Sequence, residues 1–110
     1  MYQGTTPALV LRVKDKDLTE DVTIFASIRT GTNVVTKTGD ELIVAKDDDD
    51  TLVTMTLTQN DTLKLNAGDA LVQIRYIDDD GLAWATTKAK LTVKDVIYKD
   101  VIEYDEEAEE

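Results

Sequence analysis

The sequence lacks the two residue types that most often carry reactions, since its 110 residues include no cysteine and no histidine. Without cysteine the chain has no disulfides, thiolate nucleophiles or thiolate metal ligands. Without histidine, acid and base catalysis near neutral pH would need a buried carboxylate with a raised pKa. The one serine, Ser27, has no histidine or lysine beside it, and five glycines are too scattered for a phosphate-binding loop. We therefore expect a protein that is not an enzyme and has no catalytic residues.

Long apolar runs are also missing. No window approaches the ~20 apolar residues of a membrane span, and no positively charged start leads into a signal-peptide core. We therefore expect no transmembrane segment, no export signal and no membrane partner. A chain of this length is the size of one ordinary domain with one core.

The net charge of −11 is unevenly distributed along the chain. Three segments, 47–50, 78–80 and 103–110, hold thirteen acidic residues and no basic one, so the rest of the chain is close to neutral. Runs of acidic residues are typical of solvated turns and tails. Binding a phosphate backbone needs a contiguous basic surface, whereas the twelve basic residues here are spread along the sequence. Nucleic acid is therefore not an expected partner.

What the chain does have is a repeated alternation of apolar and polar residues with a period of two. It is cleanest where Val53, Met55 and Leu57 alternate with threonines, which is typical of strands with one buried face. The residue sequence from Thr58 to Asp61 indicates an N-capped helical turn, followed by Leu63 and Leu65. The predicted strands cover residues 7–14, 22–30, 34–38, 42–45, 52–58, 70–77 and 82–93.

This pattern predicts an all-β protein, an antiparallel immunoglobulin-like β-sandwich of seven or eight strands with a short C-terminal extension. The predicted sandwich domain covers residues 1–93. Four adjacent carboxylates at 47–50 would repel one another within a strand, so they are interpreted as a loop. Residues 78–81 are interpreted as a hairpin turn, and 82–93 as one long return strand.

The pattern changes after residue 93, where Lys94-Asp-Val-Ile is repeated as Lys99-Asp-Val-Ile. Residues 94–104 are predicted to form a C-terminal arm or a short helix. Either structure leaves an apolar side that needs covering, formed by Val96, Ile97, Val101 and Ile102. Residues 105–110, with five acids and one alanine, are predicted to be a disordered acidic tail.

Trp84, the only tryptophan, is the centre of a second candidate contact surface. The alternation places it with Leu82 on an outer sheet face, near Leu71 and Ile77. This group is interpreted as a partner-binding patch, because tryptophan and large aliphatic residues are enriched at interface centres. The alternative is that this face is buried core. In the predicted strand 70–77, the run of Val72, Ile74 and Tyr76 favours the inner side for the even positions.

Calcium is the one cofactor that the acidic segments suggest. Asp47 to Asp50 and Asp78 to Asp80 each supply hard oxygen ligands, and a sandwich can bring loops from one end together. Both segments lack the alternating ligands and the glycine of a recognised calcium loop. The prediction is therefore no cofactor and no metal site, with incidental calcium binding at these loops as the alternative.

The residues Met1-Tyr-Gln-Gly-Thr-Thr-Pro7, Leu57-Thr-Gln-Asn-Asp-Thr-Leu63, Val72-Gln-Ile-Arg75 and the Asp80-Gly81 hairpin are similar to those of small phage and prophage proteins of Gram-positive bacteria. Those proteins are regarded as structural components of the tail or baseplate. The resemblance implies a structural role without catalysis, with contacts to other phage structural proteins or to further copies of the same chain. It also implies a homo-oligomer that assembles in the host cytoplasm and ends in the virion.

The same sandwich often hosts ligand-binding modules, so a carbohydrate-binding or adhesin-type domain is the alternative function. Such modules use aromatic platforms for sugar stacking. With one Trp, one Phe and four Tyr, this chain has few residues for such a platform.

Overall fold

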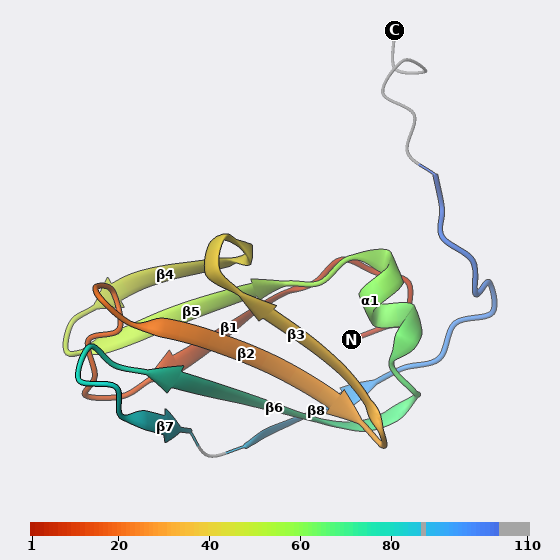
Figure 1. Ribbon diagram of the computed structural model, residues 1–110. Helices are drawn as coiled ribbons and strands as arrows, with labels where there is room; N and C mark the ends of the chain where they lie inside the picture. The colour runs from red at the N-terminus through yellow and green to blue at the C-terminus, as the bar shows by residue number, and fades with distance from the viewer. Residues whose placement is uncertain (87, 104–110) are drawn as a thin grey trace, which may run out of the picture.

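The computed structural model describes residues 1–86 and 88–103, which form two antiparallel sheets packed face to face (Figure 1). One sheet has the order β1-β5-β4. The other has the order β3-β2-β6-β7, with β8 also paired to β6. The strand bounds are Ala8–Val13 for β1, Thr23–Thr30 for β2, Asn33–Thr38 for β3, Leu42–Asp47 for β4, Asp50–Thr56 for β5, Gly68–Ile77 for β6, Ala83–Ala85 for β7 and Ala89–Val93 for β8.

The strand order follows the immunoglobulin pattern, which confirms the predicted fold class. The order β1-β5-β4 corresponds to strands B-E-D, and β3-β2-β6 followed by β7 and β8 corresponds to C′-C-F-G. Within the described residues the sandwich has eight strands. An isolated parallel bridge joins Tyr2 to Lys94 beside the end of β8.

The core lies between the two sheets and is built by the alternating pattern. Ile24, Ala26 and Ile28 of β2 point inward, as do Val72 and the other even positions of β6. This confirms the prediction that the even side of β6 faces the core. Every buried side-chain nitrogen or oxygen of the described residues has a hydrogen-bond partner, as expected for a well-packed interior.

A short helix, α1 (Gln59–Lys64), connects the sheets at one end of the sandwich. Its capping box confirms the predicted N-cap: Asp61 N–H donates to Thr58 Oγ1 at 3.1 Å, and Thr58 N–H donates to the Asp61 carboxylate at 2.8 Å. Thr62 Oγ1 donates to the Thr5 carbonyl at 2.8 Å and ties the helix to the N-terminal segment. A 3₁₀ turn, η1 (Gly39–Glu41), joins β3 to β4.

The prediction of one long strand over 82–93 is wrong, because the structure has two short strands, β7 and β8, on the same edge of β6. Arg75 pairs with Ala85 and Val72 with Ala89, so the register of β8 with β6 is shifted by one residue from that of β7. A shift of one residue is the offset that a β-bulge produces. Thr86 holds the ladder here, since Ile74 N–H donates to Thr86 Oγ1 at 3.1 Å and Thr86 N–H donates to the Ile74 carbonyl at 2.9 Å.

The acidic segment 47–50 is tighter than the predicted loop. Asp47 pairs with Asp50 as the last rung of β4 and β5, and only Asp48 and Asp49 form the turn, with Asp48 at a φ of 58°. The prediction that these carboxylates lie outside the strands is thus wrong for Asp47 and Asp50. Arg12 offsets their repulsion, because its guanidinium donates to both carboxylates at 2.7 Å.

Residues 94–103 leave the sandwich beyond β8 and contain no helix. Tyr104, which ends the predicted arm, and the predicted disordered tail 105–110 lie outside the described residues. Within the part of the chain that the structure describes, no helix has the length and apolar composition to cross a bilayer.

Candidate interaction surfaces

The first surface is the C-terminal arm, defined here as residues 94–103. It is anchored where it leaves the sheet: Gln3 N–H donates to the Lys94 carbonyl at 2.9 Å, and Lys94 N–H donates to the Met1 carbonyl at 2.6 Å. The Lys94 ammonium also lies 5.4 Å from the centroid of the Tyr2 ring. The start of the arm is therefore part of the folded domain.

Further along, hydrogen bonds and an ion pair from polar side chains hold the arm. The Gln59 amide binds the backbone of Ile102 through two hydrogen bonds, Nε2 to the carbonyl at 3.0 Å and Ile102 N–H to Oε1 at 2.7 Å. Lys99 Nζ donates to Gln3 Oε1 at 2.7 Å and forms an ion pair with Asp95. Gln59 lies on α1, so these contacts place the arm at the helix end of the sandwich.

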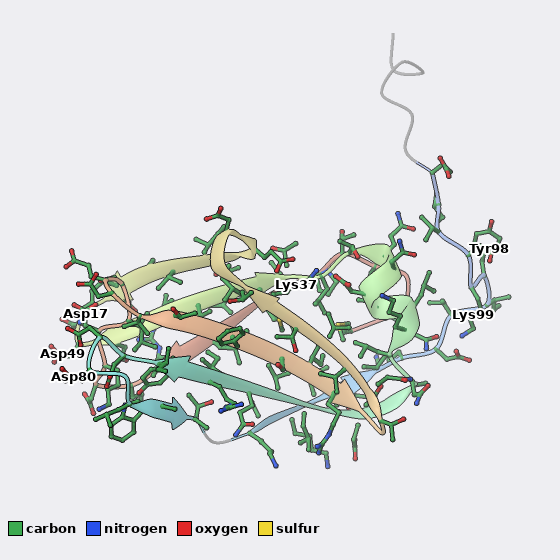
Figure 2. The ribbon with its side chains drawn as sticks, viewed as in Figure 1. Asp17, Lys37, Asp49, Asp80, Tyr98 and Lys99 are labelled. Atoms are coloured by element: carbon green, nitrogen blue, oxygen red, sulfur yellow. The ribbon has the colours of Figure 1, made fainter. Side chains whose placement is uncertain are left out.

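The apolar side chains of the arm are mostly left in solvent. Ile97 is fully exposed, Ile102 is 65% exposed, and Tyr98 and Val101 are also exposed. Val96 is the only one of the four predicted contact residues of the arm that is half-buried. Figure 2 shows Tyr98 and Lys99 on this segment, at the opposite end of the molecule from Asp17, Asp49 and Asp80.

Trp84 is not on the face that the sequence suggested. It lies directly opposite Tyr76 in the β6–β7 ladder, and Tyr76 is buried. Cross-strand partners share a face, so Trp84 and Leu82 point to the inner side, at the end of the sandwich. Leu71 and Ile77 point to the outer side, because odd positions of β6 face away from the core. The predicted group of Trp84, Leu82, Ile77 and Leu71 is therefore divided between two faces.

The Trp84 ring is already engaged within the molecule. Its indole Nε1 donates to Asp78 Oδ2 at 3.0 Å, and the Lys16 ammonium lies 5.1 Å from the ring centroid. The indole N–H and the backbone N–H groups of Leu82 and Asp80 hold the pKa of the Asp78 carboxyl below its ordinary value. One face of the indole is thus covered by a cation, which limits its use as a sugar-stacking platform.

Leu71 and Ile77 do lie on an outer face, that of the five-stranded sheet, but with other neighbours than the predicted ones. Here they lie with Phe25 and Val34, which are both exposed. Two shallow hollows mark this face, one lined by Leu71, Val34 and neighbouring polar residues and the other by Phe25, Ile77 and Ala83. The alternation within residues 22–30, in which Phe25 stands between the buried Ile24 and Ala26, is the sequence signal that could have identified Phe25 as part of this surface.

The aspartate segments 47–50 and 78–80 lie at one end of the sandwich, where Figure 2 labels Asp49 and Asp80. Their best-placed oxygens already have partners. Asp78 accepts from Trp84, Leu82 and Asp80, and Asp50 accepts from Asp15 N–H and Arg12. These contacts lower the pKa values of both carboxyls. Asp78, Asp79 and Asp80 bring carboxylate oxygens within 4.8 Å of one another. The absence of a metal site stays a prediction, with incidental calcium binding at these loops as its alternative.

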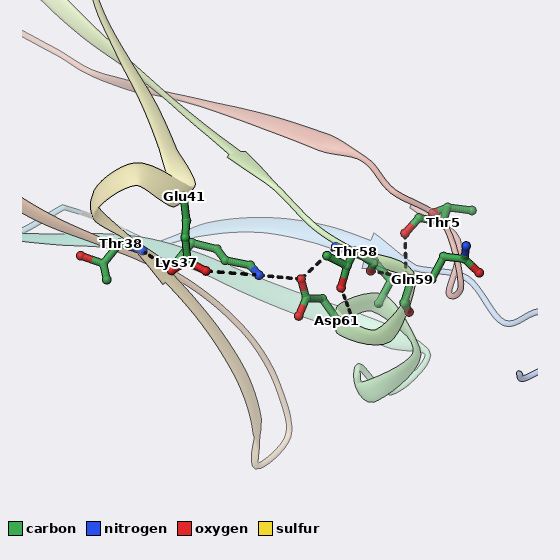
Figure 3. Close-up of polar contacts among 8 residues, drawn as sticks. Thr5, Lys37, Thr38, Glu41, Thr58, Gln59 and Asp61 are labelled. Atoms are coloured by element: carbon green, nitrogen blue, oxygen red, sulfur yellow. Dashed lines mark hydrogen bonds and ion pairs between the residues drawn. The ribbon is translucent and has the colours of Figure 1, made fainter. Parts of the chain in front are cut away.

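The most buried ion pair among the described residues joins Lys37 to Asp61. Lys37 Nζ lies 2.8 Å from the Asp61 carboxylate, and both side chains are largely buried (Figure 3). Partial burial raises the pKa of Asp61, but hydrogen bonds from Lys37 and Thr58 outweigh this effect and leave the pKa below its ordinary value. The carboxylate is therefore held ionised and capped, which suits a structural contact.

Comparison of the chain with protein-family models and with curated proteins gives no match.

Proposed function

We propose that this protein is a non-enzymatic structural component of a phage or prophage tail or baseplate that works through protein–protein contacts. The observation that carries the proposal is the C-terminal arm. It is fastened to the sandwich by polar side chains, whereas Ile97, Ile102 and Tyr98 are left in water.

The energetics of the arm favour a docking role. Burying one large aliphatic side chain is worth about 1.5 to 3 kcal/mol. Ile97 and Ile102 are exposed in the single molecule, so most of this stabilising free energy is not realised there. A partner that buries them would gain it on binding. The Gln59 contacts hold the backbone of Ile102 in place, so less conformational entropy is lost when the arm docks.

The rest of the molecule is consistent with a contact role. The buried carboxylate of Asp61 is ionised and paired to Lys37, which is the reverse of the raised pKa that acid catalysis would need. The sandwich is held by packing and strand pairing without disulfides. The resemblance to tail and baseplate proteins then supplies the narrower assignment.

The test is incorporation into phage particles by the bacterium that carries the gene. We expect the protein to copurify with intact tails in several copies per particle. The double variant Ile97→Ser/Ile102→Ser should be lost from particles while its thermal midpoint changes little. The matched control is Ile43→Ser, which changes an isoleucine that is 66% exposed on the other sheet and should be incorporated normally.

Two results would contradict the proposal. One is a wild-type protein that is absent from purified tails. The other is an arm variant that is incorporated as well as the wild type.

A further inference from the structure

The outer face of the five-stranded sheet has a charge opposite to that of the chain as a whole. Ladder register and the first hollow place four cations and one carboxylate on it among the described residues, Arg29, Arg75, Lys88, Lys90 and Asp69. Asp69 is paired with Lys90 at 3.2 Å. Arg29, Arg75 and Lys88 form no ion pair within the described residues. An excess of positive charge on one face of a chain with net charge −11 marks a surface suited to an acidic partner.

The same face carries apolar side chains between its cations. In the register of β2 and β6, Phe25 lies opposite Arg75, and Leu71 lies opposite Arg29. Val34 of β3 also lies opposite Arg29. A suitable partner would therefore combine exposed aliphatic or aromatic groups with closely spaced carboxylates, in an extended segment that can follow the sheet.

The C-terminal end of the chain has this combination. The arm exposes Ile97, Tyr98 and Ile102, and the sequence from Tyr104 to Glu110 then contains five acids and no basic residue. The acidic loops at the other end of the sandwich match less well. They are folded turns. The large apolar side chains exposed next to segment 78–80 are Ile77, which belongs to the outer face itself, Leu82 and Trp84, the last already covered on one face by Lys16.

We propose that the arm and acidic tail of one copy dock on the outer face of the five-stranded sheet of a second copy. Ile97 and Ile102 would pack against the apolar patch formed by Phe25, Leu71 and Ile77. The tail carboxylates would form ion pairs with Arg29, Arg75 and Lys88. This inference rests on the proposed function, because it names the partner of the arm as another copy of the chain.

The position of α1 favours a second copy over the same molecule. Lys37 lies opposite Ala26, which is fully buried, so the Lys37 side chain is on the inner side of the five-stranded sheet. Its partner Asp61 places α1 on that side too, and Gln59 of α1 holds Ile102 there. The seven residues from Tyr104 to Glu110 span at most ~25 Å, and they would have to pass around the sheet edge to reach the outer face of their own molecule.

Such a contact joins two different surfaces, the arm of one copy and the sheet face of the next. Each copy then keeps one arm and one face free for further neighbours. Heterologous contacts of this kind close into rings or continue as filaments. We therefore expect a series of oligomers in solution whose size increases with protein concentration. Their size should decrease as salt is raised, because salt screens the charge pairs at the contact.

The test is a charge exchange in the full-length chain, followed by sedimentation velocity. The face variant is Arg29→Glu/Arg75→Glu, and the tail variant changes Asp105, Glu106, Glu107, Glu109 and Glu110 to lysine. Each variant alone should associate at least ~10-fold more weakly than the wild type, because like charges then meet at the contact. An equimolar mixture of the two should associate again, since each presents the charge that the other lacks.

The matched control is Lys14→Glu/Lys46→Glu, which makes the same charge change at two exposed lysines away from this face and should associate like the wild type. Circular dichroism and thermal melting confirm that each variant is folded. A monomeric wild type at all concentrations, a face variant that associates normally, or a mixture that fails to associate would overturn the inference. A concentration-independent compaction that depends on Arg29 and Arg75 would show docking within one molecule and would also overturn it.

These outcomes are separable from those for the proposed function. If the charge exchange fails while Ile97→Ser/Ile102→Ser is still lost from tails, the arm binds a different tail protein and only the present inference falls. If the wild type is absent from tails, the proposed function fails whatever the charge exchange shows.

Discussion

The ammonium of Lys37, on the edge strand β3, lies 2.8 Å from the carboxylate of Asp61, which caps α1. The pair joins the five-stranded sheet to the helix that connects the two sheets. Because Gln59 of the same helix holds the arm, this contact links the sandwich to the candidate docking segment.

Removing the charge of Lys37 should therefore destabilise the fold. In Lys37→Met the Asp61 carboxylate is left nearly buried without its cation, at a cost of about 2 to 3 kcal/mol in the free energy of unfolding. Urea denaturation measures this. The control Glu41→Gln removes the other, exposed partner of Lys37 at 3.8 Å and should change stability by less than ~0.5 kcal/mol. Equal effects of the two substitutions would refute the assignment.

The same pair predicts a pH dependence of stability. Because the pKa of Asp61 is lower in the folded state, its contribution is complete above the unfolded-state pKa of about 3.9 and is lost as pH falls through the lower folded value. Lys37→Met should weaken or reverse this loss, since burial alone raises the pKa. Urea midpoints measured between neutral and acidic pH report the difference. Parallel pH profiles for the two proteins would argue against it.

Trp84 should report the protonation of Asp78. Acidification neutralises the carboxylate that accepts the indole N–H, and the lowered pKa of Asp78 places this change below the range of an ordinary aspartate. Since Trp84 is the only tryptophan, intrinsic fluorescence follows it directly. Asp78→Ala should abolish the transition, whereas Asp79→Ala should retain it. A transition that survives in Asp78→Ala would assign it to another group.

Thr86 should be needed for the ladder between β6 and the return segment. Thr86→Val removes the hydroxyl oxygen that accepts from Ile74 N–H, which should cost about 1 to 2 kcal/mol. The amide of Ile74 should also exchange with solvent faster. The comparison is Thr92→Val on the outer face of β8, which should change stability little. Unchanged exchange at Ile74 in Thr86→Val would contradict this role.

The sequence was sufficient for much of the sandwich, because a buried face imposes a period of two wherever a strand has one wet side. This held for Ile24 to Ile28, and the capping box at Thr58 was likewise a local pattern. The division of residues 82–93 into β7 and β8 could not be predicted, because it depends on a hydrogen bond from the distant backbone N–H of Ile74 to the Thr86 hydroxyl.

The candidate surfaces were harder to predict than the core. The face of Trp84 depends on its pairing with Tyr76, and turn geometry sets that register across the hairpin. The basic outer face is formed by Arg29 of β2 and Arg75 of β6, which lie far apart in the sequence. It could therefore be recognised only once the pairing of these strands was known. The apolar arm residues could be named because Val96, Ile97, Val101 and Ile102 are contiguous pairs. The amide of Gln59, which holds the backbone of Ile102, could not be predicted.

The most direct test of the account compares the full chain with a chain that ends at Lys94, which keeps the contacts of Lys94 with Met1 and Gln3. Sedimentation velocity and thermal melting are measured on both proteins. The shortened chain should keep a cooperative transition, lose no more than about 1 to 2 kcal/mol of stability, and no longer associate. A shortened chain that is unfolded would show that the arm belongs to the core, and one that associates like the full chain would show that contacts are made elsewhere.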